Sequence, residues 1–354
     1  MNKMNKREQQ IVNFIRSCEK AQSSDVHEYL AKNGEEISLV SVKRALSELE
    51  SGGVLKIHGA GPATSYTLSE YGKLITPVDA AAYNAIDPDR RYGAKSYDFE
   101  LFAALNFDLF DDEEKKVLDA ATDYYKSRLV GVSETIHKKE LERFVIELSW
   151  KSSKIEGNTY TLLDTEALIL RGQKAEGKSE EEARMILNHK NAFTYIYTNK
   201  DQFKELKRKN IEEVHRLLVE GLNVQNNFRA KPVGIAGSLY RPLDNPFQIA
   251  EAVEALIAAV ARAQSLYAKA LITLSGTSYI QPFEDGNKRT ARLMANAILF
   301  ANDLAPVSYR SVDEKTYREA TLTFYELNSL VPLKKIFIEQ YDFAARNYLI
   351  GVSN

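Results

Sequence analysis

The sequence predicts a mostly α-helical protein with a small N-terminal unit of three helices and a β-hairpin. Apolar residues recur at helical spacing through almost the whole chain after residue 99. Strand-like alternation is confined to two short regions, near residues 54–68 and 228–247. The length of 354 residues allows two or three domains, each with its own core.

The N-terminal unit is predicted over residues 1–76. Apolar stripes mark three helices: Ile11, Val12, Phe14, Ile15 and Cys18 on the first, Val26, Tyr29 and Leu30 on the second, and Val42, Leu46 and Leu49 on the third. Residues 54–57 and 65–68 then alternate as two strands around a glycine-rich turn at 59–62. Three helices followed by a hairpin resemble a winged helix-turn-helix domain.

The charge of this unit leaves its partner open. The third helix would present Ser38, Ser41, Lys43, Arg44 and Ser47 outward, a set that suits a DNA groove. However, residues 1–76 hold ten Lys or Arg and nine Asp or Glu, whereas a DNA-binding module usually has a clearly basic face. Both DNA binding and a protein-docking role, including pairing as a homodimer, therefore stay open, and the charge favours the second.

A linker is predicted at residues 77–98, because Pro77, Pro88, Gly93 and several alanines break the helical pattern. The domain that follows, 99–354, carries ten helical runs, at 113–130, 134–155, 161–171, 179–199, 208–222, 248–267, 268–280, 287–303, 313–328 and 333–349. One region interrupts them. Val233, Gly234, Ile235, Ala236 and Gly237 predict a short β-hairpin flap.

Composition restricts the location and the class of partner. Lys and Arg number 47 against 49 Asp and Glu, so the total charge does not favour a polyanion. The single Cys18 excludes an intramolecular disulfide and is predicted to be a core thiol in a reducing compartment. No apolar leader or membrane-length segment is present in this sequence, which favours a cytoplasmic protein without a membrane partner.

Residues 281–292 carry the strongest functional signal, Gln-Pro-Phe-Glu-Asp-Gly-Asn-Lys-Arg-Thr-Ala-Arg. Pro282 disfavours the helical conformation in the residue before it, so Gln281 is expected in an extended turn. Gly286 permits an unusual backbone angle, and Asn287 suits the start of a helix. The free amides and dipole of a helix N-terminus favour an anion at this point.

The side chains of this segment suit a polyphosphate. Arg289 and Arg292 are three residues apart on one helical face and could clamp the same phosphate chain. Asp285 could hold a hard cation such as Mg²⁺ that bridges phosphates. Phe283 is expected to point into the core and anchor the loop. The pattern predicts a cradle for a nucleoside triphosphate with a metal ion.

The segment resembles the signature of the Fic family, His-Pro-Phe-x-Asp/Glu-Gly-Asn-Gly/Lys-Arg-x-x-Arg, and the resemblance covers about residues 100–330. It implies an enzyme that moves AMP from ATP onto a hydroxyl side chain, either of a target protein or of the enzyme itself. It also implies Asp285 as the Mg²⁺ ligand and residues 233–237 as a flap that aligns the target by strand addition. The implied ATP-binding residues are Phe283, Gly286, Asn287, Lys288, Arg289 and Arg292.

Two positions depart from the commonest form of the signature. The resemblance places the family's catalytic histidine at Gln281, and a glutamine amide cannot accept a proton at neutral pH. The loss of a general base typically lowers a rate by about 10²–10⁴. Lys288 replaces a glycine, and the Doc kinases of the same fold also have lysine there, although Gly286 and Arg292 favour adenylylation. A kinase and a catalytically inactive nucleotide-binding regulator therefore remain alternatives.

A second segment resembles the family's inhibitory motif, Ser/Thr-x-x-x-Glu-Gly/Asn. Ser152 and Glu156 are four residues apart on one face of a helix expected near residues 145–157. The resemblance implies that Glu156 pairs with Arg292 and occupies the γ-phosphate position. Residue pattern alone also allows Glu156 to be an ordinary helix-end carboxylate with Gly157 as the cap, and both descriptions can hold together.

Overall fold

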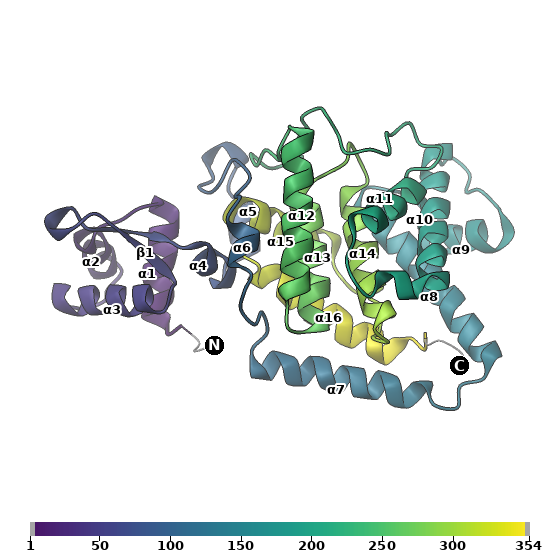
Figure 1. The fold of residues 1–354 in the computed structure, drawn as a ribbon, viewed down its shortest axis with the longest axis horizontal. Coiled ribbons are helices and arrows are strands. Elements are labelled where there is room, and N and C mark those ends of the chain that lie inside the picture. Colours follow the sequence, from purple (N-terminus) through teal and green to yellow (C-terminus); the bar gives the residue numbers. More distant parts are fainter. Residues whose placement is uncertain (1–3, 351–354) are drawn as a thin grey trace. The chain divides into compact units, whose positions relative to one another are not determined.

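The computed structural model describes residues 4–350, which form two compact units (Figure 1). The first unit comprises the chain up to residue 105 together with 234–241 and 319–333. The second comprises 106–233, 242–318 and the residues from 334 onward. The boundaries fall within α15 (Glu314–Leu327) and α16 (Val331–Asn347), so both helices contribute residues to each unit. The mostly helical fold class predicted from the sequence is confirmed.

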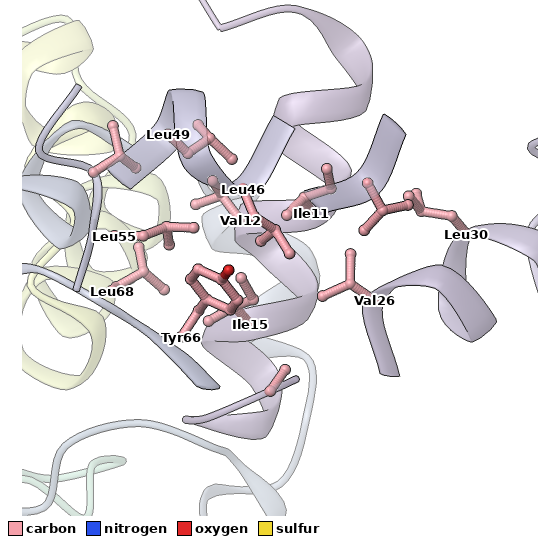
Figure 2. Close-up of a cluster of buried hydrophobic side chains, with 13 residues drawn as sticks. Ile11, Val12, Ile15, Val26, Leu30, Leu46, Leu49, Leu55, Tyr66 and Leu68 are labelled. Atoms are coloured by element: carbon pink, nitrogen blue, oxygen red, sulfur yellow. The ribbon is translucent and has the colours of Figure 1, made fainter. Parts of the chain in front are cut away.

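The N-terminal part of the first unit contains the expected three helices and hairpin, α1 (Lys6–Cys18), α2 (Ser23–Lys32), α3 (Leu39–Ser51), β1 (Leu55–His58) and β2 (Ser65–Leu68). The strands are antiparallel, with Leu55 opposite Leu68 and His58 opposite Ser65. The apolar stripes meet in one core, and Figure 2 shows Ile15 beside Tyr66, with Val26 on the side of Leu30. This arrangement is the one that the periodicity predicts.

The first helix, α1, differs from the prediction at its C-terminal end. Asn5 and Glu8 form a reciprocal capping box that begins α1. Ile11, Val12 and Ile15 are buried, whereas Cys18, the last residue of the helix, is exposed. The prediction of a core thiol is therefore wrong. The apolar stripe of the sequence extends to Cys18, but the last turn of the helix no longer packs against the core.

Three short helices follow the hairpin in the first unit: α4 (Glu70–Ile75), α5 (Ala80–Asn84) and α6 (Leu101–Ala104). Residues 77–98 hold α5 and a single 3₁₀ turn at Pro88–Arg90. Tyr83 of this segment is buried and donates a hydrogen bond of 2.7 Å to Glu326 of α15. Ser329 Oγ likewise donates to the carbonyl oxygen of Thr76 at 2.7 Å. These two hydrogen bonds join the stretch from Thr76 to Tyr83 to residues 319–333 of the same unit.

The predicted β-hairpin flap is not formed. Within residues 4–350 the strands are β1 and β2, and 233–241 is a loop. The amide of Ser238 bonds to the carbonyl oxygen of Ile235 at 3.1 Å and closes a turn, and Arg241 makes one isolated parallel bridge with Ser96. Pro232 and Pro242 flank the loop, and proline cannot donate to a strand ladder, which explains the missing hairpin.

The second unit is built from helices, α7 (Asp112–Leu129), α8 (Glu134–Ile155), α9 (Leu162–Arg171), α10 (Glu180–Thr198), α11 (Arg208–Leu218), α12 (Pro246–Arg262), α13 (Leu266–Ile280) and α14 (Asn287–Ala301). Together with α15 and α16 they match the ten predicted runs. Helix α13 packs along α14 and is buried almost all round, and α10 and α11 cover the other side of α14 (Figure 1). None of the helices described is long and apolar enough to cross a membrane.

Candidate functional site

The most informative segment of the sequence, residues 281–292, begins in the tight turn between α13 and α14 and continues into α14. Gln281 ends α13 with φ 52° and ψ 58°, a left-handed conformation and not the extended one expected before proline. That expectation was wrong because Gln281 serves as the helix cap: its amide bonds to Thr277 O at 3.3 Å. Its side-chain Nε2 donates to Ser278 O at 2.6 Å, so the side chain folds back on the helix.

Arg229 holds this turn from the preceding loop. Its Nε donates to Gln281 O at 2.7 Å, and its backbone amide donates to Pro282 O at 3.0 Å. The same guanidinium donates to the carbonyl oxygens of Lys231 and Leu243. Because Arg229 is 1% exposed, these bonds form in a site without competing water, where they are costly to lose.

An aromatic stack supports the middle of the turn. Phe283 is fully buried, as expected, and lies flat on the His215 ring, with 3.5 Å between centroids and 3° between planes. His215 Nε2 lies 3.0 Å from Asp285 O and donates to it in the tautomer that carries the proton on Nε2, because a carbonyl oxygen can only accept. Burial lowers the pKa of His215 to about 4, and Arg289 acts in the same direction. His215 is thus a neutral positioning residue for the turn.

The start of α14 presents its backbone amides without a capping side chain, because Gly286 is the N-cap residue. Gly286 has φ 78°, and a Cβ there would lie 3.3 Å from Val219 Cγ1. Asn287 ties the loop to the helix: its Oδ1 accepts from Phe283 N and its Nδ2 donates to Phe283 O, both at 2.8 Å. A rigid loop that leads into an uncapped helix N-terminus is a ready anion site.

The first arginine of the motif pairs with the motif's acid. Arg289 is 1% exposed, and its Nη2 lies 2.8 Å from Asp285 Oδ2. Burial lowers the pKa of Arg289, which Asp285 and Glu156 partly offset. The Asp285 side chain is 63% exposed, so its carboxylate lies at the solvent face of the turn.

The second arginine contacts the segment that resembles an inhibitory motif. Arg292 is fully buried, and its Nη2 lies 2.8 Å from Glu156 Oε1. Its Nε donates to Ser152 Oγ at 2.9 Å and its Nη2 to Ser152 O at 2.8 Å. Tyr317 lies against the guanidinium, with 5.7 Å from Cζ to the ring centroid. The structure thus brings together Ser152, Glu156 and Arg292, which lie up to 140 residues apart in the chain.

Glu156 also faces a second cation of the motif. Lys288 Nζ lies 3.4 Å from Glu156 Oε2, so the carboxylate bridges Lys288 and Arg292. Burial alone would raise the pKa of Glu156, but Arg292 and then Lys288 outweigh it, and the pKa lies below its ordinary value. Glu156 ends α8, and Gly157 follows it with φ 95°. The glycine cap therefore places the ionised glutamate against the motif.

The sequence did not predict several contacts that build this site. The contacts of Arg229, Tyr317 and His215 with the motif each join distant segments, so residue spacing could not indicate them. The contact between Lys288 and Glu156 could have been anticipated, because a lysine one turn before Arg292 shares its face. Residues 234–237 of the predicted flap belong to the first unit, where Arg91 Nη1 donates to Gly237 O at 3.0 Å.

Comparison with known proteins identifies the domain that carries this turn. Residues 205–299 match the model of the Fic/DOC family. Protein adenylyltransferase Fic of Nematostella vectensis is 28% identical over 186 residues, 51% of this chain and 44% of that protein. Protein adenylyltransferase fic-1 of Caenorhabditis briggsae is 24% identical over 200 residues, which are 55% of this chain and 39% of that protein. Protein adenylyltransferase Fic of Drosophila grimshawi is 30% identical over 166 residues, which are 45% of this chain and 33% of that protein.

These matches confirm the Fic-like domain expected from the sequence, and the chain spans less than half the length of these curated relatives. Solved structures agree in fold. A Fic-1 fragment from C. elegans superimposes with a TM-score of 0.55 at 20% identity, covering 67% of this chain and 71% of that one. A Fic domain containing signaling protein from Bacteroides thetaiotaomicron superimposes with a TM-score of 0.54 at 21% identity. The match covers 67% of this chain and 100% of that one.

Proposed function

We propose that this chain is a Fic-type protein adenylyltransferase, which transfers AMP from ATP to a hydroxyl side chain of a target protein. The observation that carries the proposal is the buried pair of motif arginines at the uncapped start of α14. Arg289 and Arg292 lie at 1% and 0% exposure beside free helix amides, an arrangement that suits a triphosphate chain. The curated relatives that match this part of the chain are named protein adenylyltransferases.

The residues of the turn fit Mg²⁺ bound with ATP. Mg²⁺ usually takes one or two protein carboxylates and completes its shell with water and phosphate oxygens. Asp285 supplies one such carboxylate at the solvent face, and no cluster of three metal-ligating side chains occurs among residues 4–350. When bound, the ion would neutralise phosphate charge and orient the α-phosphate. Within this chain, the amides that follow Gly286 would hold that phosphate.

We further propose that Glu156 inhibits the enzyme by occupying Arg292. A γ-phosphate and the Glu156 carboxylate would compete for the same guanidinium, because Arg292 Nη2 already lies 2.8 Å from Glu156 Oε1. Lys288 reinforces the closed arrangement through its own contact at 3.4 Å. ATP could then bind in a productive pose only after Glu156 moves away.

Gln281 should leave the enzyme with little or no turnover. A target hydroxyl needs a base at this position, and the Gln281 amide accepts no proton. The left-handed backbone at 281 suits a histidine, since histidine is among the residues enriched at positive φ. A restored histidine should therefore fit without disturbing the turn.

The loop at 234–241 is our candidate for the surface that aligns the target, through its backbone groups. The three helices and hairpin at the N-terminus would form a winged-helix module that binds a protein partner, a second copy of the chain, or DNA. The near-balanced charge of residues 1–76 favours a protein partner over DNA.

The test is labelling by radiolabelled ATP. The double variant Gln281→His, Glu156→Gly should incorporate label from the α-phosphate into itself or into added proteins, and Gln281→His alone should incorporate less. Transfer of label from the γ-phosphate instead would favour a Doc-like kinase. If neither label is transferred although ATP binds, the chain is a nucleotide-binding regulator without catalytic activity.

A further inference from the structure

We propose that the first unit contains a second ligand site, a cavity that binds a small organic anion through Arg16. The cavity has a volume of about 440 Å³ and lies between the hairpin and residues 326–328 of the same unit. Pockets that hold small molecules span about 300–1,000 Å³, so this one has room for a ligand of modest size. All of its lining residues belong to the first unit, and the site is independent of the proposed nucleotide cradle.

Arg16 is the unusual feature of the lining. It is 7% exposed, and no carboxylate of residues 4–350 forms an ion pair with it. Its guanidinium makes only long contacts, 3.4–3.5 Å, to the carbonyl oxygens of Lys73, Thr76 and Pro77, and its Nε has no hydrogen-bond partner. A buried cation that lacks a counter-ion is destabilising, and an anion bound beside it would relieve that cost.

The two lysines of the cavity wall, by contrast, are already paired. Lys56 contacts Glu70 at 2.5 Å, and Lys73 contacts Asp98 at 2.9 Å. Glu326, also in the lining, accepts from Tyr83 at 2.7 Å and lies 3.4 Å from Arg91. Glu19 lies at the exposed end of α1 and makes no ion pair with Arg16. Arg16 is therefore the cation of the wall whose charge is left uncompensated.

The rest of the cavity wall is partly apolar and favours a ligand with an apolar body. Leu68, Ala94 and Leu327 supply apolar surface, and the lysine stems extend it. A single anionic group for Arg16 and an apolar body for this wall describe a small carboxylic acid or a phosphate monoester. Arginine binds both groups through the same planar fork.

The cavity is connected to the loop at 234–241. The backbone of Glu326 accepts from the amide of Ala94 at 2.7 Å, and its side chain accepts from Ser238 Oγ at 2.5 Å. Arg91 joins Glu326 to Gly237 O. A ligand in this cavity would thus contact the residue that holds the loop, which makes it suited to regulate that loop.

The test is saturation-transfer NMR on the full chain with two probes, benzoate and phenyl phosphate, and with neutral benzyl alcohol as the reference. At least one anion should bind saturably with a Kd below about 1 mM. Arg16→Met should weaken that binding at least about tenfold, as expected for a lost charge-assisted contact. Whichever anion binds more tightly identifies the headgroup.

A second variant keeps Arg16 and its carbonyl contacts intact. Thr67→Phe, on the half-buried face of β2, should fill the cavity and abolish binding of the anion that the unmodified chain prefers. Failure of both anions to bind the unmodified chain would overturn the proposal. Binding that survives undiminished in Thr67→Phe or in a folded Arg16→Met protein would overturn it too.

Discussion

Replacing Glu156 with glutamine should destabilise the second unit far more than an ordinary carboxylate-to-amide change. The substitution preserves shape but removes the negative charge that faces Arg292, which is fully buried. Arg292 and Lys288 would lose their shared counter-ion, the Glu156 carboxylate, which now lies 2.8 Å from Arg292 and 3.4 Å from Lys288.

The magnitude follows from the burial of the pair. Breaking a buried ion pair by removing one partner costs about 3–5 kcal/mol, because the remaining charge stays uncompensated. The Glu156 side chain is 18% exposed, so the lower end, about 3 kcal/mol, is the appropriate expectation. Urea titration monitored by circular dichroism would measure the loss as a lower midpoint at unchanged slope.

The same unit provides a matched control. Glu212 Oε1 lies 2.9 Å from Arg208 Nε, but both side chains are exposed to 36% and 44%, respectively. An exposed helical pair of this kind contributes about 0.3–0.5 kcal/mol, so Glu212→Gln should change the midpoint very little. Equal losses for Glu156→Gln and Glu212→Gln would refute the view that burial makes the first pair important.

Three further outcomes are expected from the turn before α14. Gly286→Ala should cost about 1–3 kcal/mol of stability, because φ is 78° there, and Ala at Gly234, which has neither a positive φ of this kind nor a neighbour within 4 Å, is the comparison. Arg229→Met should cost about 3 kcal/mol in thermal or urea unfolding, since it removes three carbonyl contacts in a buried site; a change below the error of the measurement would contradict the assigned role. His215 has a folded pKa near 4, below its ordinary 6.5, so the unfolded chain takes up the proton first as the pH falls. Stability should therefore decline by about 3 kcal/mol between pH 6.5 and 4, and His215→Phe should lack this part of the slope.

Much of the helical structure of the second unit could be predicted from the sequence, because the positions of helices depend on local patterns of apolar residues. Helical periodicity located ten helices to within a few residues, and the run at 134–155 agrees with α8 at both ends. The contact of Glu156 with Arg292 was also foreseen, but only through resemblance to a family motif. Spacing alone placed Glu156 beside Ser152 and could not select its partner.

The errors have a common physical origin in tertiary context. Gln281 adopts a left-handed conformation because the end of α13 and the Arg229 contact outweigh the local preference before proline. The loop at 233–241 forms no hairpin, because Pro232 and Pro242 cannot donate to a strand ladder and Ser238 bonds to Glu326, 88 residues away. The buried, unneutralised Arg16 likewise has no signature in the sequence, since its environment comes from residues 57–61 positions away.

Calorimetry with ATP and Mg²⁺ tests the central claim most directly, because binding does not depend on the residue at position 281. The account predicts that the unmodified chain binds weakly and that Glu156→Gly binds at least about tenfold more tightly, since the γ-phosphate no longer competes for Arg292. Arg292→Met in the Glu156→Gly background should reverse that gain. Absence of binding heat in both the unmodified chain and Glu156→Gly, with both proteins folded, would contradict the claim that residues 281–292 form a nucleotide cradle closed by Glu156.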